Sequence, residues 1–245
     1  MSVEFGLLIL LILGAYLLGS VPAAYLAVKW SRGIDIRREG TGTVGAANVL
    51  RLAPKWLVIP VTIFDIGKGA LTVWVAQLLG LGAAEQVTVG VITVIGHNWP
   101  IFLRFQGGRG VFTTLGVVTM LSPILGLIIL VLAYSLAPFR QLALGVFLAL
   151  VSMPIFSWFL SQPLGIEERL AVTLGFVALA LIGLLKRLVV PRTPLSKSVP
   201  LRQLLLNRLL FDRDIRDREA WIHRTPPEVS SAEQPLDQQE KQGKD

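Results

Sequence analysis

Long apolar runs are the feature that most constrains how this chain folds. A helix needs about 20 consecutive apolar residues to cross the hydrocarbon core of a bilayer, and runs of this kind fill most of the first 190 residues. Hydrophobic residues make up 53% of the chain and the mean hydropathy is +0.65, which is typical of lipid-embedded protein and not of a soluble domain. We therefore predict an all-α polytopic membrane protein with about seven transmembrane helices, at 5–29, 56–80, 86–104, 111–123, 124–138, 142–160 and 170–190.

Two of these spans are short. Residues 111–138 have to form two helices, with Ser122 and Pro123 as the turn between them, so this pair is expected to be short, tilted or partly re-entrant. The first span has Glu4 before its apolar run, where a cleavable signal peptide has basic residues, so we interpret it as a retained helix.

The distribution of Lys and Arg predicts the orientation, because these residues concentrate on the cytoplasmic side of bacterial membranes. With seven spans, the loops at 30–55 and 104–110, the turn at 139–141 and the tail after 190 share one side, and all but two of the 23 Lys and Arg lie on or border it. We therefore predict a multi-pass protein of the bacterial cell membrane, with the N-terminus outside and the C-terminus cytoplasmic. The net charge of +7 is then explained by topology and anionic lipid headgroups, and no nucleic-acid partner is expected.

The predicted organisation is a transmembrane domain over 1–190, a cytoplasmic amphipathic, basic segment over 191–224 and a disordered tail over 225–245. The middle segment either lies flat on the membrane or packs on the protein's own cytoplasmic face or on a partner. The chain has no cysteine and only two histidines, so we predict no disulfide, no metal and no cofactor.

The loop at 96–110 reads Gly-His-Asn-Trp-Pro-Ile-Phe-Leu-Arg-Phe-Gln-Gly-Gly-Arg-Gly and is suited to holding an anion. Its glycines let the backbone approach a ligand closely, and its two arginines offer charge-assisted hydrogen bonds to phosphate. The candidate binding residues here are Arg104, Gly107, Gly108, Arg109 and Gly110. His97 is a candidate general base, although a histidine at a helix end more often orients a loop.

A second glycine-rich loop follows the first span, at 33–51. Backbone N–H groups at its glycines, two hydroxyls, an amide and a guanidinium provide a set of donors for a phosphate and its neighbouring hydroxyls. The candidate binding residues are Thr41, Gly42, Thr43, Gly45, Asn48 and Arg51. Two such loops on one membrane face make phosphate binding at the membrane surface the leading hypothesis.

Asp65 and Lys68 lie inside the second span, where ionisable groups are costly, and their spacing places them on one helical face. We predict a structural ion pair and rank direct substrate contact second. Ser20 and Arg140 are also assigned supporting roles, and Trp99 and Trp158 are predicted to be interfacial or packing aromatics.

These motifs resemble the bacterial integral-membrane acyl-phosphate:glycerol-3-phosphate acyltransferases. Gly40 to Arg51 resemble the family's first block, Gly-Ser-Gly-Asn-(Ile/Pro)-Gly-Ala-Thr-Asn-Val-Leu-Arg. Gly96 to Val111 are similar to the second block, Gly-His-x-(Phe/Trp)-Pro-x-Phe-Leu-(Lys/Arg)-Phe-Lys-Gly-Gly-Lys-Gly-Val, and Asp65 to Gly69 to the Asp-x-x-Lys-Gly segment. The resemblance covers about 17–116.

The resemblance implies a seven-helix fold and a defined reaction. A fatty acyl phosphate would donate its acyl group to the 1-hydroxyl of glycerol 3-phosphate, giving lysophosphatidic acid for phospholipid synthesis without a metal or a cofactor. Thr41 and Arg51 correspond to substrate-binding residues and Arg109 to the Gly-Gly-Lys-Gly lysine, so Arg109 is the main candidate catalytic cation. The expected partners are these two substrates and membrane lipids, and enzymes of phospholipid synthesis are further candidates.

The second half of the chain departs from the family pattern. Arg140 remains at the Arg-Tyr-x-Ser-x-x-Ser turn without its serines, and the closing His-(Arg/Lys)-x-Asn block is replaced by Leu185-Lys186-Arg187. Two hypotheses follow: an active acyltransferase in which Arg202, Asn207 or His223 of the tail replaces the lost contacts, or a catalytically inactive member that binds phosphorylated lipid precursors or a partner enzyme. A transporter of small phosphorylated solutes is a more distant third.

Overall fold

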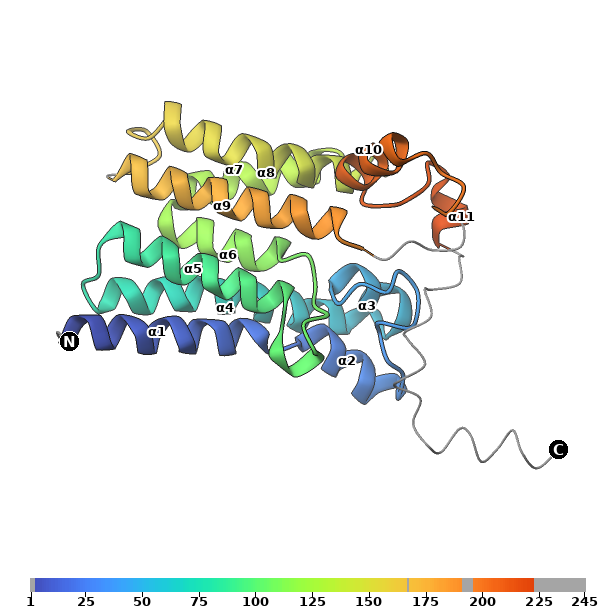
Figure 1. Ribbon diagram of the computed structural model, residues 1–245, viewed down its shortest axis with the longest axis horizontal. Coiled ribbons are helices and arrows are strands. Elements are labelled where there is room, and N and C mark those ends of the chain that lie inside the picture. The colour runs from blue at the N-terminus through green and yellow to red at the C-terminus, as the bar shows by residue number, and fades with distance from the viewer. Residues whose placement is uncertain (1–2, 167, 191–195, 223–245) are drawn as a thin grey trace.

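The computed structural model is an all-helical bundle, and it describes residues 3–166, 168–190 and 196–222. Within these residues there is no strand. Seven helices run side by side along the long axis of the molecule (Figure 1). They are α1 (Val3–Ser20), α4 (Val58–Leu78), α5 (Ala83–Asn98), α6 (Val111–Leu121), α7 (Pro123–Ser135), α8 (Leu142–Phe159) and α9 (Arg169–Leu188). The predicted fold class, an all-α polytopic membrane protein, is confirmed.

Five helical segments in the described residues are long and apolar enough to cross a bilayer, at Gly6–Arg32, Lys55–Leu78, Ala83–Leu103, Leu142–Phe159 and Arg169–Leu188. The shorter α6 and α7 complete the bundle between them. Ser122 stands between these two helices, and its hydroxyl accepts a hydrogen bond from the Leu125 N–H and caps α7, while Pro123 occupies the first turn. The short hairpin expected from the sequence is therefore present.

The first predicted span, 5–29, is not one continuous helix. Helix α1 ends at Ser20, and α2 (Ala23–Arg32) begins after Val21 and Pro22 and turns away from the bundle axis (Figure 1). Proline has no N–H to donate and disfavours helical geometry in the residue before it, which accounts for the break. The Lys68 ammonium donates to the Val21 carbonyl at 3.3 Å, so a side chain from α4 replaces a lost helical hydrogen bond.

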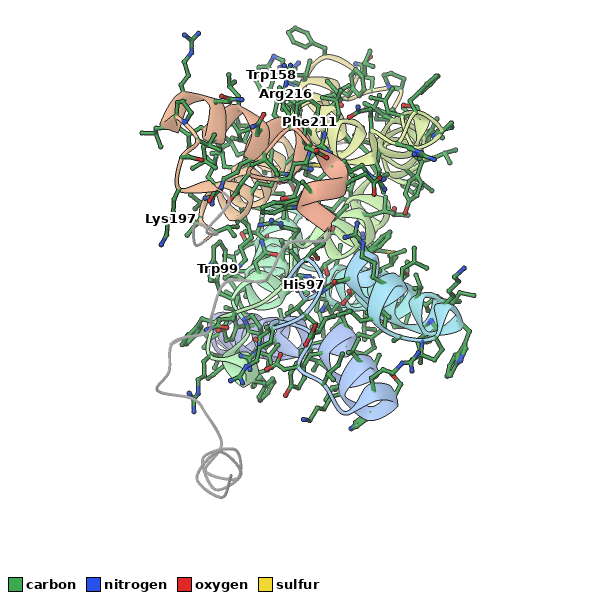
Figure 2. The ribbon with its side chains drawn as sticks, turned by 90° about the vertical axis from the view of Figure 1, so that its right-hand side faces the viewer. His97, Trp99, Trp158, Lys197, Phe211 and Arg216 are labelled. Atoms are coloured by element: carbon green, nitrogen blue, oxygen red, sulfur yellow. The ribbon has the colours of Figure 1, made fainter. Side chains whose placement is uncertain are left out.

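The two ends of the bundle differ in what they carry. Helix α1 begins at the left-hand end in Figure 1, and α2, α3 (Ala46–Leu52), α10 (Leu201–Phe211) and α11 (Arg218–Ile222) gather at the right-hand end. Both glycine-rich loops lie at this same right-hand end, which we call the loop end. Figure 2 looks onto it and shows His97 and Trp99 near its centre.

Packing divides the molecule into an interior and a lipid-facing surface. The main core lies between α6, α7, α8 and α9. Its fully buried side chains are Val117, Leu125, Met153, Phe176 and Leu179. On the outside, large apolar side chains stay exposed along the same helices, including Leu127, Leu174 and Leu181. Helices that are apolar on every side fit a membrane environment, because lipid takes the place of water around them.

The segment after α9 packs on the protein itself. Helix α10 lies against α8 and α9, and it buries Leu204, Asn207 and Arg208. It is separate from α11, so residues 196–222, the described part of the segment predicted over 191–224, contain two short helices. The predicted disordered tail at 225–245, and His223, lie outside the described residues.

Candidate active site

The first glycine-rich loop is organised around Asn48 of α3. The buried Asn48 amide donates to the carbonyls of Ile36, Glu39 and Thr43 at 3.1–3.2 Å, and its oxygen accepts from the Thr41 N–H at 3.0 Å. A single buried side chain therefore sets the path of residues 36–43. The sequence predicts Asn48 as a substrate contact, but these bonds give it a different role, that of positioning Thr41 and Thr43.

Thr41 and Thr43 hold their hydroxyls together, 2.8 Å apart, in a partly buried part of this loop. At the loop's start Arg37 pairs with Asp35 at 2.6 Å, and its guanidinium also reaches the Leu103 carbonyl and the Gln106 side chain of the second loop, both at 3.5 Å. Burial alone would raise the pKa of the Asp35 carboxyl, but hydrogen bonds from Arg37 and the charges of Arg37 and Arg38 together lower it below its ordinary value. Asp35 therefore stays ionised and fixes Arg37 as a bridge between the loops.

The second loop lies directly against the first. It leaves α5 at Asn98, makes the short helix η2 (Ile101–Leu103) and enters α6 at Gly110. Gly110 adopts a left-handed backbone (φ 72°), and a methyl group there would collide with the Asn98 side chain, so a glycine is required on both counts. Gly108 is held between the His97 ring and the Val44 carbonyl of the first loop, and its N–H donates to the His97 carbonyl at 3.2 Å.

A buried charged cluster supports this meeting point. Asp65 pairs with Lys68 at 2.8 Å, with both side chains at most 4% exposed, and its carboxylate also lies 3.5 Å from Nδ1 of His97. Nε2 of His97 faces Gly108. The predicted pairing of Asp65 with Lys68 is thus observed, and the same carboxylate orients His97 against the second loop.

A small cavity of about 10 Å³ opens between this cluster and the break after α1. It is lined by Ser20, Val44, Asp65, His97 and Gly107. The Ser20 hydroxyl is fully buried and makes no hydrogen bond within the part of the chain that the structure describes. A volume of this size holds about one water molecule, which would satisfy the Ser20 hydroxyl.

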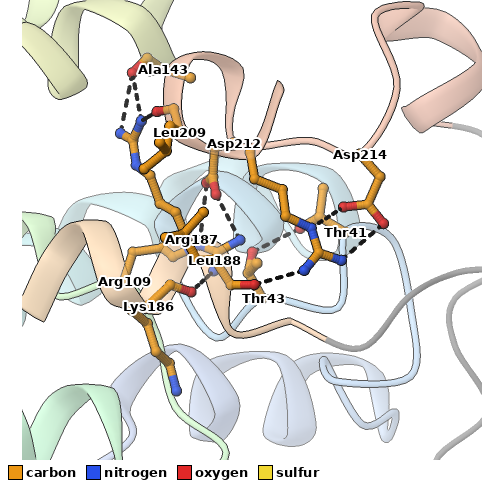
Figure 3. A network of polar contacts seen from close by, with 11 residues as sticks. Thr41, Thr43, Arg109, Ala143, Lys186, Arg187, Leu188, Leu209, Asp212 and Asp214 are labelled. Carbon is orange, nitrogen blue, oxygen red and sulfur yellow. Dashed lines mark hydrogen bonds and ion pairs between the residues drawn. The ribbon is translucent and has the colours of Figure 1, made fainter. Parts of the chain in front are cut away.

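Arg109, the cation of the Gly-Gly-Arg-Gly sequence, is bound by the C-terminal segment (Figure 3). Its guanidinium pairs with the carboxylate of Asp212 at 2.7 Å and also donates to the Lys186 carbonyl at the end of α9. The Lys186 side chain continues from there to Trp99, whose ring centre is 4.9 Å from the ammonium. Cations from α9 and from the second loop therefore meet at this point.

Two further arginines fasten the C-terminal segment over the site. The buried Arg187 donates to the carbonyls of Ala143 on α8 and Leu209 on α10 at 3.1 and 2.6 Å. Arg208 pairs with Asp214 at 2.7 Å and donates to the Leu188 carbonyl at 2.7 Å. Together these bonds tie α8, α9 and α10 to one another at the loop end (Figure 3).

Sequence reasoning placed some of these residues and missed others. The structure brings Thr41, Thr43, His97, Gly107, Gly108 and Arg109 to one end, as predicted, while Arg140 is exposed in the α7–α8 turn at positive φ. Arg51 and Arg104 are exposed, on α3 and at the end of η2. Asp212, Asp214, Lys186 and Arg187 were not identified as site residues. A charge at the end of a span, such as Lys186 or Arg187, usually marks only the membrane interface, and the two aspartates follow α10, far in sequence from the second loop.

The tail residues proposed as replacements for the missing family contacts are placed differently. The Asn207 amide is buried and donates to the Asp214 carbonyl at 3.1 Å, and Arg202 is exposed. Asp212 of this segment contacts Arg109 of the second loop. The C-terminal segment does fold back onto the site, but its contact is made by the Asp212 carboxylate and not by the Arg202 or Asn207 side chain.

The arrangement has the elements needed to bind phosphate. The two loops offer backbone N–H groups, and Arg109 lies next to Lys186 at the end of α9. Such donors are suited to a phosphate and to a developing oxyanion. The described residues contain no group of three or more His, Asp or Glu arranged to hold a metal ion. Binding and orientation of anions are the chemistry that these groups are suited to.

Comparisons with known proteins place this site in a family. The sequence profile described as "Glycerol-3-phosphate acyltransferase" matches residues 9–189. A protein of Dehalococcoides mccartyi strain CBDB1, "Glycerol-3-phosphate acyltransferase 4", is 44% identical over 216 residues, covering 88% of this chain and 93% of that protein. Because 216 residues exceed the length of 9–189, this similarity extends beyond the family profile into the remainder of the chain.

Solved structures give the same result. The crystal structure of PlsY (YgiH), an integral membrane glycerol 3-phosphate acyltransferase, in its glycerol 3-phosphate form, has a TM-score of 0.67 at 28% identity and covers 74% of this chain and 88% of that one. Its lysophosphatidic acid form has a TM-score of 0.65 at the same identity. The chain therefore belongs to the glycerol-3-phosphate acyltransferase family of integral membrane acyltransferases.

Proposed function

We propose that the protein transfers a fatty acyl group from an acyl phosphate to the 1-hydroxyl of glycerol 3-phosphate, giving lysophosphatidic acid, at a site on the cytoplasmic side of the membrane. One observation carries the proposal: both glycine-rich loops meet at Gly108, next to Arg109 and a buried carboxylate–histidine pair. The similar PlsY structures hold glycerol 3-phosphate and lysophosphatidic acid, an acceptor and a product of this kind.

The chemistry requires positioning more than activation. An acyl phosphate is already an activated anhydride, so attack by the acceptor hydroxyl on its carbonyl carbon breaks the bond to phosphate, and the hydroxyl proton leaves with a phosphate oxygen or solvent. The protein then has to align two anionic substrates and stabilise the oxyanion. Arg109 and the N–H groups of Gly107, Arg109 and Gly110 would bind one phosphate, and Thr41 and Thr43 would hold acceptor oxygens.

His97 fits a positioning role better than that of a general base. Its Nδ1 edge faces Asp65 and its Nε2 edge faces Gly108, so both ring nitrogens are directed at protein atoms. A general base has to reach the proton that it removes. We therefore assign His97 to holding the second loop in place, with Asp65 fixing the orientation of the ring.

Orientation in the membrane follows the distribution of charge. The loop end carries both glycine-rich loops, at 33–45 and 99–110, and the Arg- and Lys-rich segment at 197–218. Helix α1 begins at the other end (Figure 1). The positive-inside rule assigns the loop end to the cytoplasm.

The test is release of phosphate from palmitoyl phosphate when glycerol 3-phosphate is added to the purified protein. Release should depend on the acceptor, yield lysophosphatidic acid and fall at least 100-fold in Arg109→Ala, while Arg32→Ala, an exposed arginine of α2, should behave as wild type. The same assay with palmitoyl coenzyme A defines the donor. Transfer from the thioester but not from the acyl phosphate would refute acyl phosphate as the donor. The assignment of glycerol 3-phosphate as the acceptor would still hold.

The catalytically inactive alternative predicts ligand binding without turnover in the same assay. The similarity to proteins named as acyltransferases over 88% of the chain favours the active enzyme.

A further inference from the structure

Lys186 is a cation that the described structure leaves without a carboxylate partner. It is partly buried at the end of α9, and within the described residues it is not part of any ion pair. Its ammonium lies over the Trp99 ring, which stabilises the charge without neutralising it. The nearby buried or partly buried carboxylates have other partners. Asp65 pairs with Lys68, Asp212 with Arg109 and Asp214 with Arg208.

Charge is unbalanced around this lysine. Lys186 is close enough to Arg109 and His97 to interact with them electrostatically, and Arg187 interacts in the same way with Arg109 and Asp212. Arg109 pairs with Asp212 and Arg187 interacts with the same carboxylate, whereas Lys186 does neither. The three cations together therefore carry two more positive charges than this carboxylate balances. Like charges brought together away from bulk water repel one another, so such an arrangement is stabilised by an anion. A phosphate monoester carries a charge of about −1.5 to −2 near neutral pH, which matches this excess.

The direction of the side chain agrees with this balance. In Figure 3 the Lys186 ammonium points away from Asp212, although its backbone carbonyl accepts a hydrogen bond from Arg109. The ammonium is directed to the Trp99 side of the site, where the second loop leaves α5. Lys186 is also close enough to Arg109 to interact with it electrostatically, so one anion could contact both cations.

From this geometry we infer that Lys186 is a direct ligand of a substrate phosphate and forms a two-cation site with Arg109. The inference rests on the proposed function and adds to it a binding residue from the part of the chain that departs from the family pattern. The arginine fork, which is bonded to Asp212 in this structure, would pass to two phosphate oxygens, and lysine contributes a compact charge that approaches a third. The ligand is a phosphate group, of either the acceptor or the acyl donor.

Steady-state kinetics of the full-length protein, in micelles free of anionic lipid, test this role. Lys186→Met keeps most of the side-chain length and removes the charge, so it should raise KM for one phosphorylated substrate at least tenfold and weaken inhibition by inorganic phosphate to the same extent. Lys186→Arg should recover most of both effects. Lys197→Met is the matched control, because Lys197 is exposed at the same end of the molecule (Figure 2), and it should leave both constants unchanged. Measuring KM separately for glycerol 3-phosphate and for the acyl phosphate shows which substrate's phosphate Lys186 binds.

Chemical labelling of wild-type protein provides a second measurement that needs neither turnover nor a folded variant. Amine acetylation read by mass spectrometry should show phosphate protecting Lys186 several-fold and leaving Lys197 unaffected. Equal labelling of Lys186 with and without phosphate would overturn the inference, as would unchanged KM and phosphate inhibition in Lys186→Met. Protection of Lys186 in a protein that transfers no acyl group would instead refute the proposed reaction and retain the phosphate site.

Discussion

Gly108 provides the sharpest test of how the two loops form one site. A methyl group added there would lie under 3.0 Å from both the His97 ring and the Val44 carbonyl, closer than real methyl carbons approach such atoms. One partner is backbone and the other is held by Asp65, so neither can rotate aside. Relieving both contacts requires the loops to separate by roughly 1 Å, since favourable contacts begin near 3.5 Å.

The expected cost of Gly108→Ala follows from this displacement. Overpacking of this kind destabilises a protein by about 1–3 kcal/mol. A misplacement of about 1 Å at a reacting centre lowers the rate about 100-fold, equivalent to about 2.7 kcal/mol of transition-state stabilisation. We therefore expect kcat/KM for acyl transfer to fall about 100-fold, with a lower thermal unfolding midpoint.

The assay compares Gly108→Ala with Gly67→Ala, measuring initial rates of phosphate release and unfolding of the same detergent-solubilised samples. A methyl group at Gly67, in the interior of α4, meets nothing within 4 Å and should change neither quantity appreciably. If Gly108→Ala keeps the wild-type kcat/KM and melting temperature, contact between the loops does not build the site and this reasoning is wrong.

Three further substitutions test the supporting contacts. Asp65→Asn should destabilise the protein by about 3–5 kcal/mol, because it leaves Lys68 as an unpaired buried cation; thermal unfolding checks this, and Asp65→Asn combined with Lys68→Met should recover part of the loss. Asn48→Ala removes four hydrogen bonds from the 36–43 loop, so we expect a loss of about 1–3 kcal/mol and faster proteolysis within that loop; an unchanged digestion rate would contradict this. Asp212→Asn breaks a partly exposed ion pair, so the free energy of unfolding should change by less than about 1 kcal/mol. Inhibition by inorganic phosphate should strengthen several-fold, because Arg109 is released from Asp212. Weaker inhibition would mean that Asp212 orients Arg109 for the ligand.

Hydropathy and motif spacing were sufficient to predict the class of fold. Apolar runs identified the helices, and the Ser122-Pro123 turn identified the short hairpin, because cap residues act locally. The break after α1 was not predicted, although Val21-Pro22 carries the signal, because the flanking residues are apolar enough to continue a span. Hydropathy averages over a window and so does not resolve a two-residue interruption.

The site was only partly predictable because long-range pairing decides it. Thr41, Arg109 and the loop glycines belong to compact motifs, so their grouping is visible in the sequence. The contact of Arg109 with Asp212 joins residues 103 positions apart, and the role of Asn48 depends on the carbonyls that surround it. Neither residue type nor spacing encodes these partners.

The short hairpin bears on how deep in the membrane the proposed reaction would take place. At 1.5 Å per residue, the 11 residues of α6 and the 13 of α7 extend roughly 17 and 20 Å, well short of a hydrocarbon core about 30 Å thick. A hairpin of this length cannot reach both headgroup regions, so a Ser122 turn at one surface would put the Gly107–Gly110 loop, which starts α6, below the headgroups of the opposite leaflet. Its polar backbone is tolerated there because protein surrounds it. In the proposed reaction, a fatty acyl donor would reach this level by moving sideways within its leaflet, whereas a water-soluble sugar-alcohol phosphate would have to enter from solution. The two substrates would then arrive from different phases at a point between them.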